Sequence, residues 1–218
     1  DPRHHTPHGF VRRRQRPARP PAVLLVGPTG SGKTPLGKLL EERGLWGRAC
    51  RHFDFGEQLR RAAAGDERAA PLTASETEFL RGVLRDGALL EDEQFPIAEK
   101  ILRAFLRRGG PGWLVLNGLP RHVGQAADVD RLADVRAVVE LTCGPETVLA
   151  RIRSDAGGDR AGRDDDGAEA VASRLRTFAQ RTAPLVEHYR RLGARIETVP
   201  VAADTSPEQA WQKLSERG

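Results

Sequence analysis

The sequence has no methionine, one tyrosine and only two cysteines among its 218 residues. Cys50 and Cys143 are too few for a disulfide framework, and their spacing fits no zinc pattern, so we expect a reducing, cytoplasmic setting. No apolar run approaches the roughly 20 residues that span a membrane, so we expect no membrane partner. A hydrophobic fraction of 39% suits the core of one domain. We expect a monomer.

Lysine is scarce, with four residues against 31 arginines, and the excess positive charge is confined to one end. Residues 1–21 hold six arginines and one aspartate, a formal +5 that equals the charge of the whole chain, so residues 22–218 sum to zero. Five prolines and three histidines make this segment typical of a disordered tail. Four roles stay open for it: a solvated leader, a weak electrostatic arm for nucleic acid or anionic surfaces, an organelle transit peptide, and a histidine metal site. We expect no other nucleic-acid contact.

One stretch, from Gly27 to Thr34, organises the chain. It matches the phosphate-binding pattern G-x-x-x-x-G-K-[ST] at every fixed position, between an apolar run at 22–26 and leucines at helical spacing. The glycines let successive N–H groups point inward, and with the positive end of the following helix they form a polyphosphate site. The alternative is a glycine-rich turn without a ligand, which would not require the strand and helix. The predicted ATP-binding residues here are Gly27, Pro28, Thr29, Gly30, Ser31, Gly32, Lys33 and Thr34.

Further segments predict strands that alternate with helices. The mainly apolar runs at 113–116 and 135–141 are typical of buried strands, and the stretches 51–55 and 194–199 also predict strands. Periodicity and capping signals predict helices at 73–86, 92–108 and 168–192, the last interrupted by Pro184, and helices opened near Pro145 and Pro207. The charged, glycine-rich stretch 151–167 predicts a surface loop. This alternation predicts a parallel sheet covered on both faces.

Several stretches, in order, resemble adenylate kinase and other nucleoside monophosphate (NMP) kinases. Besides the phosphate loop they are Gly56-Glu57-Gln58-Leu59-Arg60, Asn117-Gly118-Leu119-Pro120-Arg121 with Gln125, Gly144-Pro145-Glu146-Thr147, Gly162-Arg163-Asp164-Asp165-Asp166, and Arg174-Leu175 through Thr182-Ala183-Pro184 to Tyr189. The resemblance implies an α/β P-loop NTPase fold, with a parallel five-stranded sheet and helices on both faces, for residues 22–218. It also implies a helical NMP-binding region at about 54–90 and a short lid at about 152–166 without zinc cysteines.

The resemblance also implies residue roles, because phosphoryl transfer between two anionic nucleotides needs charge neutralisation and alignment. The implied catalytic residues are Lys33, Arg121, Arg163 and Arg174. The implied NMP-binding residues are Phe55, Arg60, Gly118, Arg121 and Gln125. Arg151 would stack on the ATP adenine, and Mg²⁺ would be held by Thr34 and, through water, by Asn117. The alternative for each arginine is a solvated surface charge, and Asp54 could be either a pocket residue or a helix N-cap.

Three positions depart from the family pattern. Asn117 stands where the family has an aspartate, Phe55 stands where it has a small hydroxyl residue, and Asp155 stands where it has a lid arginine. Arg153 or Arg160 is expected to replace that arginine. The sequence favours an enzyme that transfers the ATP γ-phosphoryl group to an NMP, with AMP preferred. The alternatives are a P-loop kinase for another small acceptor and a nucleotide-binding regulator with little turnover that contacts RNA through its tail.

Overall fold

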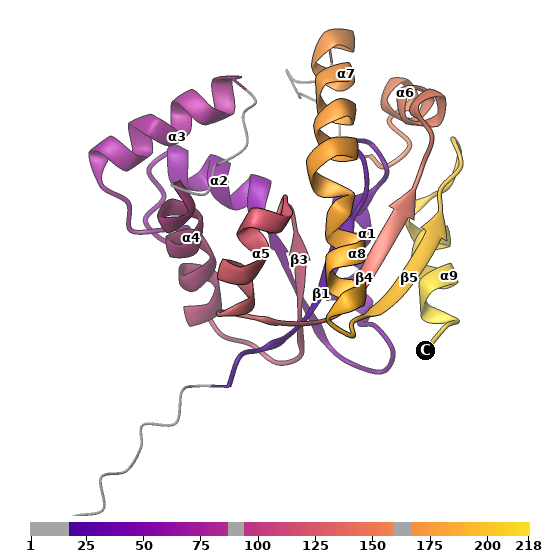
Figure 1. The fold of residues 1–218 in the computed structure, drawn as a ribbon, viewed down its shortest axis with the longest axis horizontal. Helices are drawn as coiled ribbons and strands as arrows, with labels where there is room; N and C mark the ends of the chain where they lie inside the picture. Colours follow the sequence, from indigo (N-terminus) through magenta and orange to yellow (C-terminus); the bar gives the residue numbers. More distant parts are fainter. Residues whose placement is uncertain (1–17, 87–93, 159–166) are drawn as a thin grey trace, which may run out of the picture.

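The computed structural model of the protein describes residues 18–86, 94–158 and 167–218 (Figure 1). Predictions that concern residues 1–17, the end of the NMP-binding region at 87–90, and the lid residues Arg160 and Arg163 lie outside the described residues. Within those ranges, no helix combines the length and the apolarity that a membrane crossing would need.

A five-stranded parallel sheet forms the centre of the molecule, as the sequence predicts. The strand order is β2-β3-β1-β4-β5, so the strand before the phosphate loop lies in the middle. Every neighbouring pair is parallel. The strands are β1 Pro21–Val26, β2 Cys50–Asp54, β3 Trp113–Asn117, β4 Asp134–Thr142 and β5 Arg195–Pro200.

Helices cover both faces of the sheet, because alternate residues of the central strand pack into two separate cores. Ala22 and Leu24 belong to one core, while Val23 and Leu25 belong to the other. The second core includes α1 (Lys33–Arg43) and α9 (Pro207–Ser215), and the first includes α2 (Phe55–Ala63), α4 (Phe95–Arg107), α5 (Val123–Asp130) and α8 (Pro184–Arg191). Helix α3 (Ala74–Asp86) also contributes to the first core, through Leu80, and the remaining helices are α6 (Pro145–Ser154) and α7 (Ala168–Thr177). In Figure 1, α3 and α7 stand on either side above the carboxyl edge of the sheet.

The N-terminal boundary of the fold lies slightly earlier than predicted. Strand β1 begins at Pro21, and the carbonyl of Pro20 accepts a hydrogen bond of 2.9 Å from the Asp134 backbone N–H. The last residues of the predicted tail therefore belong to the sheet. Proline is tolerated here because it starts the strand.

Two predicted segments end differently in the structure. The strand predicted at 51–55 stops at Asp54, because the Asp54 carboxylate caps α2 by accepting the Glu57 N–H at 3.2 Å, and Phe55 is already helical. The prediction of a loop at 151–167 is wrong for its first residues, since helix α6 continues to Ser154. The helix is ended by Asp155, whose backbone is in the left-handed region (φ +50°). Arg151 and Arg153 are thus part of a helix, and Arg151 is buried.

The long helix predicted at 168–192 is present, but its interruption differs. A π-helical segment, Phe178–Thr182, separates α7 from α8, with the Ala183 N–H bonded to the Phe178 carbonyl at 2.8 Å. Pro184 then occupies the first turn of α8, where its missing N–H is tolerated. The irregularity therefore precedes the proline.

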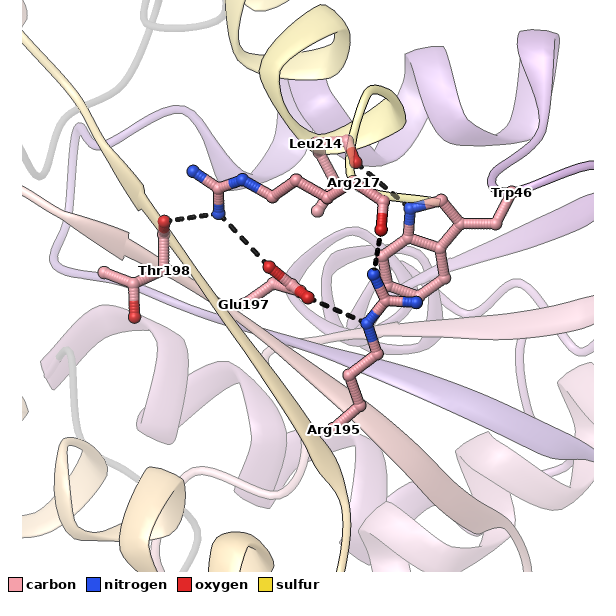
Figure 2. A network of polar contacts seen from close by, with 6 residues as sticks. All are labelled: Trp46, Arg195, Glu197, Thr198, Leu214 and Arg217. Carbon is pink, nitrogen blue, oxygen red and sulfur yellow. Dashed lines mark hydrogen bonds and ion pairs between the residues drawn. The ribbon is translucent and has the colours of Figure 1, made fainter.

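The C-terminal residues fasten the edge strand β5 to the loop after α1 (Figure 2). Trp46 donates its indole N–H to the Leu214 carbonyl at 3.0 Å, and the Arg195 guanidinium lies 3.8 Å from the centre of the Trp46 ring. Glu197 accepts from Arg195 at 2.8 Å and from Arg217 at 3.3 Å. These charges also line an exposed sheet edge, where they oppose pairing with another chain.

Candidate nucleotide site

The phosphate loop has the backbone conformation that its glycines permit. Gly30 and Gly32 have φ values of +75° and +98°, a region that residues with a Cβ rarely adopt. The Ser31 N–H closes a turn onto the Pro28 carbonyl at 3.1 Å, and α1 starts directly after Gly32. The loop therefore ends on a helix N-terminus, which favours anions.

The loop contains groups that match a polyphosphate. Lys33 Nζ donates to the carbonyls of Gly27 at 2.6 Å and Pro28 at 3.1 Å, so its ammonium group lies over the loop. The buried Ser31 hydroxyl has no hydrogen-bond partner among the described residues. A Cβ at Gly27 would lie 2.5 Å from that hydroxyl and 3.1 Å from Leu141 Cβ, so a larger residue would crowd the loop. Phosphate oxygens would satisfy a hydroxyl donor for which the described part of the chain offers no acceptor.

Polar side chains from three elements meet beside Thr34, the residue predicted to bind Mg²⁺. Its Oγ1 lies 3.2 Å from Asn117 Nδ2 at the end of β3 and 3.4 Å from Asp54 Oδ2 at the end of β2. Hydroxyl, carboxylate and amide oxygens are the hard ligands that Mg²⁺ prefers, directly or through water. The residues therefore fit this ion, and the predicted partners Thr34 and Asn117 are in contact.

His52 joins the same cluster, although the sequence reading did not single it out. Its Nε2 lies 3.3 Å from Asn117 Nδ2, and its ring packs against α1 where Gly37 leaves room; a Cβ there would lie 2.3 Å from Nε2. Burial lowers the pKa of His52, an effect that the negative charge of Asp54 opposes. Alternation along β2 puts His52 and Asp54 on one face of the strand, and this is the signal that could have identified both.

Arginines gather on the other side of the carboxyl edge. Burial lowers the pKa of Arg121, and the positive charges of Arg174 and Arg60 lower it further, while the Asp54 carboxylate opposes the shift. The structure thus brings three of the predicted arginines together from the β3–α5 loop, α7 and α2. Arg121 Nε also donates to the Gly118 carbonyl at 3.1 Å. This cluster of like charges is suited to an anionic group.

The residues predicted to surround the acceptor base are buried. Gln125 accepts the Arg121 backbone N–H through Oε1 at 2.9 Å and is only 1% exposed. Phe55 is 2% exposed and stacks on Phe53, with ring centres 6.0 Å apart. A Cβ at Gly118 would lie 3.4 Å from Phe55 Cβ, so these segments approach closely. In this arrangement Gln125 positions Arg121; base binding by Gln125 and Phe55 stays a prediction.

Arg151 is a buried residue whose side chain holds the phosphate loop in place through hydrogen bonds. It is 3% exposed, and its guanidinium donates to the carbonyls of Gly30 at 2.8 Å, Ala202 at 2.9 Å and Thr205 at 2.9 Å. Its Nη2 would lie 3.3 Å from a Cβ at Gly32. Arg151 therefore connects α6, the phosphate loop and the segment after β5. Adenine stacking stays a prediction. Arg153 is exposed on α6, so the choice of lid arginine also stays open.

Comparison with known proteins agrees with this geometry. A family model described as an AAA domain matches residues 26–172. The adenylate kinase of Synechococcus sp. (strain CC9311) is 33% identical over 177 residues, which cover 78% of this chain and 85% of that protein. The adenylate kinase of Rhizobium meliloti (strain 1021) is 33% identical over 196 residues, covering 84% and 92%. Adenylate kinase isoenzyme 1 of Caenorhabditis elegans is 32% identical over 181 residues, covering 81% and 78%.

A solved structure with a similar fold is a gluconokinase from Sinorhizobium meliloti 1021. It has a TM-score of 0.50 and 20% identity, and the match covers 92% of this chain and 97% of that one. At this identity the similarity shows the fold alone, that of a P-loop kinase. The sequence similarity to adenylate kinases extends over most of both chains, and the range matched by the family model includes the phosphate loop. The chain therefore belongs to the adenylate kinase family of nucleoside monophosphate kinases, which are phosphotransferases.

Proposed function

We propose that the protein transfers the γ-phosphoryl group of ATP, with Mg²⁺, to a nucleoside monophosphate, and that AMP is the favoured acceptor. The observation that carries the proposal is the cluster of Arg60, Arg121 and Arg174 near Asp54, whose carboxylate contacts Thr34 of the phosphate loop. A protein that only bound ATP would have no use for a second cationic site at this edge. A monophosphate dianion there would offset the mutual repulsion of the arginines.

The residues supply positioning and charge rather than covalent chemistry, as phosphoryl transfer requires. The phosphate loop and Lys33 bind the ATP phosphates, and Arg121 and Arg60 hold the acceptor phosphate in line with them. Mg²⁺, when bound beside Thr34, neutralises charge on the β- and γ-phosphates. Arg174 then lies where charge develops on the transferred group, and such fixed cations stabilise a transition state more than a ground state.

A P-loop kinase for another small acceptor is the main rival. The burial of Gln125 and the engagement of its Oε1 favour this rival, because a base would have to displace an existing hydrogen bond. Phe55 also favours this rival, because its buried ring occupies the position that is expected to contact the base. An acceptor panel separates the two hypotheses.

The test is a coupled assay of the purified protein with ATP, Mg²⁺ and a panel of AMP, dAMP, GMP, CMP, UMP and gluconate. We expect kcat/KM for AMP to exceed that for CMP and UMP at least tenfold, about 1.4 kcal/mol in transition-state binding. A preference of that size for a pyrimidine nucleotide or for gluconate would contradict the assignment.

The Lys33→Ala variant controls for contaminating kinases of the expression host. It should lose at least about 1,000-fold in kcat, because the cation over the phosphates is absent. Lys38→Ala, on the exposed side of the same helix, is the matched control and should keep full activity.

A monomeric state and a cytoplasmic location belong to the same proposal. Light scattering of the purified protein and fractionation of the source cells test them.

A further inference from the structure

The ends of β2 and β3 place a charged and a neutral side chain side by side. Asp54 and Asn117 are partners in the parallel register of these strands. Both are buried, with 8% and 4% of their surface exposed. Both contact Thr34, at 3.4 Å from Asp54 Oδ2 and 3.2 Å from Asn117 Nδ2. The carboxylate beside the phosphate-loop threonine therefore comes from β2, while β3 contributes an amide.

Capping accounts for only one of the two Asp54 oxygens. Oδ1 accepts the Glu57 N–H at 3.2 Å and so starts α2. Oδ2 lies toward Thr34 at a distance longer than the roughly 2.8 Å of an ordinary O–H···O hydrogen bond, so the hydroxyl is not committed to it. Serine or asparagine would cap a helix as well as aspartate. The cap alone therefore does not explain a carboxylate here.

Among the described residues, Asp54 has no cation in direct contact, because the positive charge of Arg121, which acts on it, lies beyond ion-pair distance. Within the described ranges, no lysine, arginine or histidine forms an ion pair with it. A buried carboxylate without a directly paired counter-charge is costly. A divalent cation between Thr34 and the ATP phosphates would supply that charge.

We propose that Asp54 provides the carboxylate of the magnesium site. Its Oδ2 holds the ion through water beside the Thr34 hydroxyl, and Asn117 orients the same hydration shell. The inference rests on the proposed function only in that the protein binds ATP with Mg²⁺; the identity of the acceptor does not enter. It gives Asp54 two roles, one oxygen for the helix cap and one for the metal.

The test measures metal affinity without turnover. Mn²⁺ replaces Mg²⁺, and the free ion is followed by electron paramagnetic resonance while it is titrated into protein saturated with ATP. We expect Asp54→Asn to weaken Mn²⁺ binding about tenfold, the lower range for removal of an outer ligand partner. Asp54→Ser should weaken it equally while keeping the cap and the melting temperature.

Exchange of the two side chains separates a metal role from a structural one. In Asp54→Asn combined with Asn117→Asp, the carboxylate returns on the neighbouring strand, and Mn²⁺ affinity should recover to within about threefold of the wild type, since an outer ligand partner is again present. A purely structural role for Asp54 predicts no recovery. Glu57→Gln, which removes an exposed carboxylate in the same helical turn, is the matched control and should change the affinity less than twofold.

Three results would overturn the proposal. They are a change below twofold in Asp54→Asn, a tenfold loss in Glu57→Gln instead, or no recovery in the exchanged pair. A wild-type protein that binds Mn²⁺ and ATP in this way but phosphorylates no monophosphate would contradict the proposed function alone. Failure of the metal proposal and failure of the acceptor proposal are thereby distinguishable.

Discussion

The two sides of the nucleotide site hold their positive charges in different ways. On the ATP side, Lys33 and Arg151 donate to backbone carbonyls of the phosphate loop and its neighbours. On the acceptor side, Arg121 lies so close to Arg60 and Arg174 that their charges lower its pKa. The fold itself satisfies the first group, while the second consists of like charges that oppose one another.

This difference indicates a division between stability and catalysis. A buried guanidinium that satisfies three carbonyls is part of the structure, and its loss leaves acceptors unpaired. A cation held beside other cations costs stability, and it is useful because an anion binds there. Substitution of the buried Arg151 on the ATP side should therefore lower stability, and substitution of Arg121 on the acceptor side should lower activity.

The largest expected effect on stability comes from Arg151→Ala. The carbonyls of Gly30, Ala202 and Thr205 would lose their donor, and we expect the free energy of unfolding to fall by about 3 kcal/mol. Urea unfolding without nucleotide measures it. Arg153→Ala, two residues along the same helix and exposed, should change the value by less than about 0.5 kcal/mol. If the Arg151 variant is as stable as the Arg153 variant, the hydrogen bonds of Arg151 do not stabilise the fold.

Arg121→Ala should lower activity and leave stability intact, in contrast to Arg151→Ala. We expect kcat/KM for the acceptor to fall about 100-fold, or about 2.7 kcal/mol, because one charge donor to the transferred group is lost. The free energy of unfolding should stay unchanged or rise, since repulsion from Arg174 and Arg60 is relieved. Arg131→Ala, exposed at the end of α5, provides the control. A stability loss as large as that of Arg151→Ala would remove the distinction between the two sides.

The smallest expected effect is the loss of stability when the ion pair between helices α3 and α4 is removed. Glu76 on α3 pairs with Lys100 on α4 at 2.8 Å and accepts the Thr73 N–H at 3.0 Å, and these contacts lower its pKa. The stability that the Glu76 carboxylate contributes is therefore fully present above its pKa in the unfolded chain, 4.5. This contribution is lost as the pH falls through the lower pKa of Glu76 in the folded protein. Glu76→Gln should cost less than about 1 kcal/mol at pH 7, because the pair is partly solvated.

The pH dependence provides the check on Glu76. Unfolding curves of the wild type and Glu76→Gln, recorded between pH 7 and pH 3, should converge as the carboxylate becomes protonated. Glu78→Gln, two residues further on the exposed face, should follow the wild type at every pH. A difference that persists at the lowest pH would mean that the glutamate acts through packing rather than charge.

Much of the site could be predicted because its signals are local. The phosphate loop is a contiguous motif, and Thr73 and Glu76 form the capping box that their spacing predicts. The strands β1, β3 and β4 are mainly apolar runs, and the parallel order follows from the alternation of strands with helices. The roles of Lys33 and Thr34 follow from the same motif and stay predictions for experiment.

Other features depend on residues far apart in the sequence. Arg151 lies in a charged stretch that predicts a loop, yet its carbonyl partners come from positions 30, 202 and 205. Nothing near Arg151 in the chain identifies these partners. Likewise, the contact of Asp54 with Thr34 requires the register of β2 against β3 and the start of α1 beside both.

By itself, the sequence determined the strands, the phosphate loop and the helix caps, because periodicity and short-range hydrogen bonding act between neighbouring residues. Only the tertiary structure decided which charges are buried, which arginines lie together and which carboxylate lies beside Thr34. The physical reason is that burial and Coulomb interaction depend on distance in space, and the parallel sheet brings the ends of strands distant in the chain to one edge.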